Sequence, residues 1–516
     1  MEAVTSGLPG RPSSLWLATV EPTAYPQLDG DLSVDVAVIG GGLAGISVAT
    51  YFKEAGKRVA VLEARQVGHG VTGNTTAKVT ALHGLVYAKL IRNFGLEKAR
   101  AYAAANSAAI GEVRRRVAEQ GIDCDLRTTT AYTYTEDPTE LDSFRAEVEA
   151  ARSVGLEVEF TTSTPLPYRV AGAIKLGDQS QFHPLKYLLA LASLLPGDGS
   201  HLFERTRVLE YEPGAPCRVV TANGVVTAAD VVIATNFPIG DKALYSFRMK
   251  PMRSYVLGVL VPAGAYAELE DSMLLGTTPG HSVRTQATDD GTMLLLGGEE
   301  HVTGEGGSTS ERYLRLERWA KARFGHVGDE DVHFRWSAHD NQTLDGAPYI
   351  GRAGPGVDHL YVATGFDGWG MTHSTISGML LRDLVLGRHT PWSEAYSPTR
   401  LNLRGMGELL ETGVRSTKHL VMDRLLADDQ WSVPRGAGEV VRDGGEMVAL
   451  YRDENGALTR LSAACTHMGC IVSWNDAERS WDCACHGSRF EPAGEVIQGP
   501  AIKPLRKLER AKRDHE

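Results

Sequence analysis

Residues 35–64 read DVAVIGGGLAGISVATYFKEAGKRVAVLEA. The run 35–40 is short, almost entirely apolar and ends in glycine, which is typical of a buried parallel strand. Residues 43–55 predict a helix, and residues 58–63 predict a second buried strand. A strand, a helix and a strand in such a short stretch predict a βαβ unit, and therefore an α/β fold.

The turn between the first strand and the helix, GGGLAG at residues 40–45, satisfies the pattern G-x-G-x-x-G. Gly40 permits a tight turn, Gly42 lets the backbone approach a pyrophosphate, and Gly45 lets the helix pack closely on the strand. The helix N-terminus offers N–H donors to phosphates. Glu63, at the end of the second strand, can accept hydrogen bonds from ribose hydroxyls. Together these features predict a dinucleotide site.

Two further glycine-rich stretches extend this pattern: GHGVTGNTTAK at residues 68–78 and ATGFDGWGMT at residues 363–372. With them the chain resembles the flavoprotein family of D-amino-acid, glycine and sarcosine oxidases, over roughly residues 33–390. The resemblance implies an α/β FAD-binding domain of the Rossmann-like, glutathione-reductase type, with an antiparallel-sheet substrate domain. Some relatives link FAD through a histidine where this chain has Ala77, so the resemblance implies non-covalent FAD.

The resemblance also implies which residues contact the cofactor. The first glycine-rich turn and the strand after it supply one group, the 68–78 stretch a second, and later turns the rest. These residues are Gly40, Gly42, Leu43, Ala44, Gly45, Glu63, Ala64, Arg65, Thr72, Gly73, Asn74, Thr75, Thr76, Ala77, Val208, Ala234, Thr235, Gly365, Gly368, Trp369, Gly370, Met371 and Thr372.

The substrate side departs from the family pattern. The family motif W-x-x-x-R stands here as Trp336 followed by Asp340, and D-x-x-P-x-I-G stands at residues 345–351. In the amino-acid oxidases that arginine clamps the substrate carboxylate, whereas a carboxylate would repel it. We therefore expect a cationic amine substrate beside Asp340, or a clamp formed by Arg253 or Arg284. The alternative is that Asp340 faces structure instead of substrate.

Three other residues are candidates to face the catalytic pocket. They are His339, Tyr255 and His373. For the histidines, a buried structural role is an equally good interpretation.

Four of the six cysteines fall near the C-terminus, where residues 465–470 read CTHMGC and residues 483–488 read CACHGS. Cys465 with His467, and Cys483 with His486, form the pattern C-x-H…C-x-x-H. Two thiolates and two imidazoles could make a structural zinc site. Against zinc, the first pair is too tight for the usual knuckle and each loop carries an extra cysteine. A Gly-Pro-Ala run at residues 499–501 also follows where a third loop would cover a cluster.

Residues 431–508 closely resemble a Rieske domain, and short strands predicted at 439–442, 447–451 and 459–462 suit its all-β fold. The resemblance implies a [2Fe–2S] cluster with one iron held by Cys465 and Cys483 and the other by His467 and His486. It pairs Cys470 with Cys485 in a disulfide. It also gives Ser488 a hydrogen bond to a cluster sulfide, which implies a potential in the upper part of roughly −150 to +300 mV.

The remaining chain divides around these two regions. We expect an N-terminal extension at 1–32, the oxidoreductase region at 33–390, a linker at 391–430, the Rieske domain at 431–508 and a tail at 509–516. Helices are predicted at 89–120 and 375–386, and strands at 230–235 and 360–364. The net charge of −11 argues against nucleic acid as a partner, and no apolar run is long enough to span a membrane. Without a signal peptide, a cytoplasmic protein is expected.

FAD can take two electrons as a hydride, whereas a Rieske cluster takes one electron at a time. The combination favours an amine or amino-compound dehydrogenase that oxidises a C–N bond and passes single electrons to an external one-electron carrier or quinone. Two alternatives remain. In one, a partner reduces the cluster and the flavin reduces an acceptor or activates oxygen. In the other, the protein is only an electron carrier.

Overall fold

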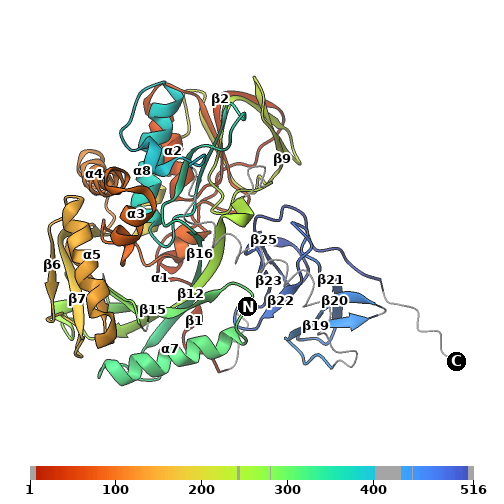
Figure 1. Cartoon of the computed structure of the whole chain (residues 1–516). Coiled ribbons are helices and arrows are strands. Elements are labelled where there is room, and N and C mark those ends of the chain that lie inside the picture. Colours follow the sequence, from red (N-terminus) through yellow and green to blue (C-terminus); the bar gives the residue numbers. More distant parts are fainter. Residues whose placement is uncertain (1–6, 241–244, 279, 401–431, 444, 510–516) are drawn as a thin grey trace.

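The computed structural model describes residues 7–240, 245–278, 280–400, 432–443 and 445–509. It consists of a layered α/β region, a large curved sheet beside it, and a small β-region at the C-terminal end (Figure 1). Among these residues, no helix combines the length and apolarity needed to cross a membrane. Most of the expected linker, 401–430, lies outside the described residues.

The α/β region is built on a sheet whose central strands are parallel. Its order is β17-β18-β11-β2-β3-β8, and β9 and β10 extend it beyond β11. Val36, Ala37 and Val38 of β2 are buried on both faces, as a central parallel strand requires. The bounds are β2 Leu32–Ile39, β3 Val59–Leu62, β8 His201–Phe203, β9 Val208–Glu212, β10 Cys217–Thr221, β11 Val225–Ile233, β17 Tyr349–Arg352 and β18 Leu360–Thr364. The predicted βαβ unit is confirmed.

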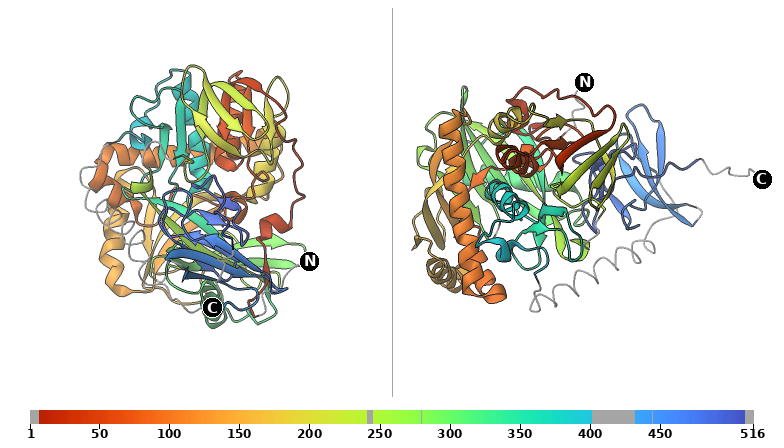
Figure 2. Two further views of the ribbon diagram at one scale, coloured as in Figure 1. Left: turned by 90° about the vertical axis from the view of Figure 1, so that its right-hand side faces the viewer. Right: turned by 90° about the horizontal axis from the view of Figure 1, so that it is seen from above.

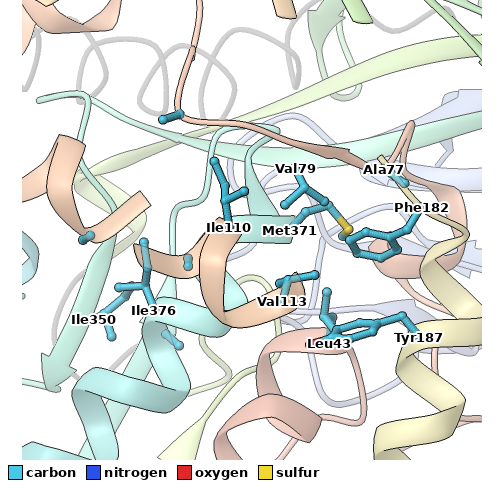
Figure 3. Close-up of a cluster of buried hydrophobic side chains, with 14 of the residues drawn as sticks. Leu43, Ala77, Val79, Ile110, Val113, Phe182, Tyr187, Ile350, Met371 and Ile376 are labelled. Carbon is cyan, nitrogen blue, oxygen red and sulfur yellow. The ribbon is translucent and has the colours of Figure 1, made fainter. Parts of the chain in front are cut away.

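Helices cover one face of this sheet. Gly378 of α8 lies where any Cβ would collide with the Tyr51 ring of α2, so these two helices cross very closely. Figure 3 shows the apolar cluster around them, in which Leu43 and Met371 lie near Val113 of a longer helix and Ile376 lies beside Ile350. The bounds are α2 Leu43–Glu54, α3 Val86–Phe94, α4 Leu96–Gln120, α6 Pro184–Ser193, α8 Gly370–Val385 and α9 Ser393–Tyr396. Helix α5, Leu141–Ser153, packs instead on strands of the other large sheet.

Two helix predictions need correction. The single helix expected at 89–120 is two helices, α3 and α4, because Gly95 between them has a φ of +85° that a helix cannot contain. The helix expected from about residue 375 begins at Gly370, directly after the glycine-rich turn.

The second sheet is mostly antiparallel, as expected, with parallel pairings of β13 with β5 and of β1 with β16. Its order is β1-β16-β12-β15-β14-β13-β5-β7-β4, with β6 also paired to β7. Helix α7, Thr309–Arg323, packs against β12 and β15. The bounds are β1 Arg11–Pro12, β4 Lys78–Val79, β5 Arg127–Thr135, β6 Val158–Thr161, β7 Gly172–Gln181, β12 Met249–Val261, β13 Ser272–Gly276, β14 Ser282–Thr288, β15 Gly291–Val302 and β16 Val332–Thr343.

The N-terminal segment belongs to this body. After β1, the short helix α1 (Leu15–Ala18) buries Trp16 completely. The Trp16 indole donates to the Thr75 carbonyl at 2.7 Å, and the Ser14 hydroxyl donates to the Gly73 carbonyl at 2.5 Å. The N-terminal segment therefore helps to hold the backbone of the 68–78 stretch in place.

The C-terminal region is all-β, as predicted. One antiparallel sheet has the order β19-β20-β21 and the other β22-β23-β24-β25. The β22–β25 sheet lies against β12 and β16 of the large antiparallel sheet in Figures 1 and 2. The bounds are β19 Gly438–Asp443, β20 Glu446–Arg452, β21 Leu458–Ser462, β22 Val472–Asn475, β23 Ser480–Cys483, β24 Arg489–Phe490 and β25 Val496–Gln498.

Candidate functional site

A cavity of about 970 Å³ opens where the central parallel strands end. Gly40 follows β2, Glu63 follows β3, Ala234 follows β11, and the turn after β18 leads to Gly368 on the same cavity wall. Ligands of open α/β sheets bind at this carboxyl edge. Its far end is lined by β12, β15 and β16 of the second sheet, so the cavity runs between the two large sheets.

The glycines of the first turn are required by close backbone approaches. Gly40 has a φ of +111°, and a Cβ there would lie 2.5 Å from the Ala234 carbonyl oxygen. A Cβ on Gly45 would overlap the Gly40 carbonyl oxygen. These contacts bring the N-terminus of α2 to the cavity, where a phosphate group would meet its N–H donors.

Glu63 is held in place at the same edge. Its carboxylate accepts the Gly41 N–H at 2.7 Å on one oxygen and the Arg65 N–H at 2.8 Å on the other. Each oxygen keeps a further lone pair, and Glu63 lines the cavity. Burial raises the pKa of this carboxyl. The site therefore fits the ribose of a dinucleotide.

The cavity gathers most of the residues predicted to contact the cofactor. Gly45, Gly73, Ala77, Gly365 and Thr372 supply no lining atom and lie behind the wall. The predicted residues that line it are Gly40, Gly42, Leu43, Ala44, Glu63, Ala64, Arg65, Thr72, Asn74, Thr75, Thr76, Val208, Ala234, Thr235, Gly368, Trp369, Gly370 and Met371.

Three carboxyl groups line the far end of the cavity: Glu300, Asp340 and Asp367, here called the acidic cluster. Burial raises the pKa of Asp340 to about 6, although the Gly368 N–H donates to it. Burial and Asp340 raise the pKa of Asp367 to about 6. Burial together with Asp367 and Asp340 raises the pKa of Glu300 to about 7. The cluster can hold a cation and can take up a proton near neutral pH.

The structure places the other candidate catalytic residues differently. His339 lines the cavity. The Tyr255 hydroxyl bonds His301 at 2.9 Å within a hydrophobic cluster, and His373 is fully buried beside Tyr102 and His83. Neither Tyr255 nor His373 is among the described residues that line the cavity.

The clamp expected of Arg284 is wrong. Its guanidinium is completely buried. It donates to backbone carbonyls and side-chain oxygens of the protein itself. The acceptors are the oxygens of Thr76, Ala77, Gln181, Phe182 and Gln286, at 2.6–3.2 Å. No N–H is left for a substrate carboxylate.

The sequence analysis missed several cavity residues, among them Glu300, His83 and Lys78. Glu300 lies within β15 near its end and carries no motif, and His83 stacks on Trp369 with ring centroids 4.3 Å apart. Burial and the nearby Arg284 lower the pKa of Lys78 to about 7. Lys78 stands inside the quoted 68–78 stretch, so its position was a usable signal.

The four predicted metal ligands come together in the C-terminal region. The Nδ1 atoms of His467 and His486 are 3.3 Å apart. A hydrogen bond from Cys483 lowers the pKa of the Cys465 thiol to about 7. Each sulfur also accepts backbone N–H groups, from residues 467 and 468 at Cys465 and from residues 485 and 486 at Cys483. Such N–H groups would equally stabilise cluster-bound thiolates, so the donor set fits a [2Fe–2S] cluster.

The predicted disulfide between Cys470 and Cys485 is confirmed and joins the two ligand loops. Although the sulfurs of Cys470, Cys483 and Cys485 lie within 4.8 Å of one another, the disulfide removes two of them as ligands. The Ser488 hydroxyl donates to Cys465 and accepts the Ala501 N–H at 3.0 Å. It is thus fixed beside the cluster position.

Arg253 joins the C-terminal region to the second sheet. It is 1% exposed and lies 3.2 Å from a Glu478 oxygen and 3.8 Å from an Asp482 oxygen. Arg489 pairs with the same two carboxylates. Burial alone would raise the pKa of Asp482, but Arg489 and Arg253 lower it. Arg253 thus links the two regions. It also lines the cavity, and its Nε and Nη2 have no hydrogen-bond partner among the described residues, so a clamp formed by Arg253 stays a prediction.

Arg253→Met is expected to destabilise the protein by about 3 kcal/mol, because removing one partner leaves buried carboxylates short of a counter-charge. The measurement is the denaturant midpoint of the holoprotein. Arg218→Met is the matched control, since the Arg218–Glu212 pair is half exposed on both sides and is worth at most about 1 kcal/mol. Equal stability of the two variants would contradict the burial argument.

Comparisons with known proteins match this architecture. The family model "FAD dependent oxidoreductase" matches residues 35–384, and the model "Rieske [2Fe-2S] domain" matches residues 424–509. A Bacillus subtilis (strain 168) protein called "Putative Rieske 2Fe-2S iron-sulfur protein YhfW" is 36% identical over 507 residues, covering 96% of this chain and 98% of its own. Gamma-glutamylputrescine oxidoreductase of Escherichia coli (strain K12) is 25% identical over 394 residues, covering 73% and 89%. Glycine oxidase from Geobacillus kaustophilus shares the fold, with a TM-score of 0.59 at 23% identity, covering 72% of this chain and 99% of its own.

Proposed function

From the premise that this chain belongs to the FAD-dependent oxidoreductase family and carries a Rieske [2Fe–2S] domain, we propose that it dehydrogenates a cationic amine. The observation that carries the proposal is the acidic cluster at the far end of the cofactor cavity. The proposed acceptor is an external one-electron carrier or a quinone. We keep 33–390 and 431–508 as the proposed limits of the two catalytic regions.

FAD supplies two-electron hydride chemistry at the C–N bond, and the cluster supplies one-electron chemistry. This chain's residues bind and orient the substrate. The acidic cluster attracts the ammonium group, and one of its carboxylates can take the ammonium proton because its pKa lies near the working pH. The neighbouring Trp369 and His83 rings give the amine an aromatic wall.

The same residues disfavour a simple α-amino acid. Asp340 stands where the family pattern has an arginine, Arg284 is fully engaged by protein oxygens, and Arg253 already lies between the carboxylates of Glu478 and Asp482. An α-carboxylate beside three acidic groups would be repelled in a site of low dielectric. The Escherichia coli relative, whose name gives gamma-glutamylputrescine as its substrate, supports an amine in this class of site.

With a cationic amine, kcat/KM should fall as the pH drops through about 7 to 6, because protonation removes negative charge from Glu300, Asp340 and Asp367. Below the last of these pKa values the slope should be at least about tenfold per pH unit. Asp340→Asn should move this acid limb to lower pH, since the Asp340 charge raises the pKa of both Glu300 and Asp367. A pH profile of both proteins checks this; a limb that stays in place would contradict it. Asp198→Asn, at an exposed surface pair, is the control.

The proposal is tested by an anaerobic stopped-flow screen of amines against α-amino acids, with flavin and cluster absorbance recorded separately. We expect rapid flavin bleaching by cationic amines, followed by loss of the oxidised cluster bands. Robust turnover of glycine or sarcosine that is lost in Asp340→Ala would overturn the cationic pocket. Bleaching only by a reductase partner would favour electron flow in the opposite direction.

A further inference from the structure

Residues 234–237 join the cofactor cavity to the cluster ligands. Ala234, Thr235 and Asn236 line the cavity directly after β11. Phe237 follows them, is 1% exposed, and turns its ring toward the Rieske region. Its ring centroid lies 6.0 Å from that of His486 and 6.4 Å from that of His467. The surface formed by these two ligands, the histidine edge, therefore faces the flavin region.

The loop is held rigidly. The Thr235 hydroxyl donates to the Phe237 carbonyl at 2.7 Å, and the Thr364 hydroxyl donates to the Asn236 carbonyl. The Asn236 side chain donates to the His339 carbonyl at 3.3 Å. Asn236 itself has a φ of +66°, which these bonds maintain. The backbone that carries Phe237 is thus fixed by bonds within the loop and to β18 and β16.

His339 makes a second contact between the same partners. It lines the cavity, and its ring bonds the Gln498 side chain of the Rieske region. Its Nε2 occupies the place that a Cβ on Gly487 would need, and Gly487 is adjacent to the ligand His486. At two independent places, therefore, a single side chain spans from the cavity to the cluster-ligand loops: Phe237 at one and His339 at the other.

The contact is also secured against separation. The buried Arg253–Glu478–Arg489–Asp482 network lies beside it, and Asp476 binds the N-terminus of α7 through Ser308 and Thr309. Domain interfaces are mobile by default unless they are large or strongly held. Separating the two regions would leave buried charges without their partners, which makes opening costly.

We propose that Phe237 is a positioning residue that holds the histidine edge against the flavin region, so that electrons cross between the two centres without any domain movement. The inference rests on the proposed function. Each substrate gives two electrons to FAD as a hydride. The reduced flavin passes these electrons one at a time to cluster Fe³⁺ and releases one proton. Two equivalents of an external one-electron acceptor then reoxidise the cluster.

The test uses anaerobic holoprotein in which a flash-photoreduced deazaflavin supplies the electrons, so that no assumption about the substrate enters. Phe237→Leu should slow electron exchange between flavin and cluster about tenfold or more, because small misplacements of reacting groups have large effects on rate. Iron content and the cluster's electron paramagnetic resonance g-values should stay unchanged. Phe247→Leu, at a half-exposed ring, is the matched control and should behave as wild type.

Exchange at the wild-type rate in Phe237→Leu would overturn the proposal. A second measurement on the wild type covers a variant that fails to load its cluster. In concentrated sucrose the exchange rate should not change. A rate that falls in proportion to viscosity would indicate a swinging domain and would also overturn the proposal. Failure of exchange in the wild type, with amine-driven flavin bleaching intact, would reject this inference and leave amine oxidation standing.

Discussion

Cys483→Ser is expected to yield a protein with FAD but without iron, inorganic sulfide or a Rieske spectrum. The Cys483 sulfur lies 1% exposed in contact with Cys465, where it accepts two backbone N–H groups. A serine hydroxyl is hard and stays protonated, whereas iron–sulfur clusters are held by thiolates. With one of two sulfur ligands gone, one iron loses half of its protein attachment.

Flavin, iron and sulfide analysis of the purified protein measures this directly. Cys217→Ser is the matched control, because Cys217 is also buried and its thiol donates to the carbonyl oxygens of Gly214 at 3.2 Å and His359 at 3.7 Å. Cys483→Ser should also abolish electron delivery to a one-electron acceptor. Stoichiometric iron in Cys483→Ser, or an equal loss in Cys217→Ser, would contradict the ligand assignment.

Gly45→Ala should give the converse result, a protein that keeps its cluster but binds FAD at least about 100-fold more weakly. The added methyl would overlap the Gly40 carbonyl oxygen, and Gly40 cannot retreat because it already lies against Ala234. Helix α2 must then move off β2, which costs about 3 kcal/mol by overpacking and shifts the phosphate-binding N–H groups. Flavin titration of the apoprotein checks the affinity. Gly111→Ala, where a Cβ meets no atom within 4 Å, should bind FAD normally; weakened binding there would point to general instability.

Sequence patterns were sufficient where local chemistry decides the structure. The 40–45 turn and the Rieske strands follow from glycine spacing and alternation, and the disulfide was implied by resemblance. Patterns failed where a residue's role depends on distant partners. No sequence feature near Arg253 predicts its pairing with Glu478 and Asp482. None near Arg284 predicts its acceptors at residues 76 and 77.

The break at Gly95 was different, because a glycine within a helical pattern is a local signal that was available. Glu300 carried no such signal. It joins the acidic cluster only because β15 ends opposite Asp340 and the turn at Asp367, which come from later parts of the chain. The pKa of Glu300 depends on those neighbours, so it cannot be predicted from the residues around Glu300 alone.

The pairing of β1 with β16 has a consequence for biosynthesis. Arg11 and Pro12 emerge from the ribosome early, but their partners Phe334 and Arg335 are made only on the order of half a minute later at typical translation rates. Trp16 packs against His183 and Arg284, so its pocket is also completed late, and the nascent chain exposes this apolar side chain until then. Chaperone binding to the segment around Trp16 would protect it during that interval.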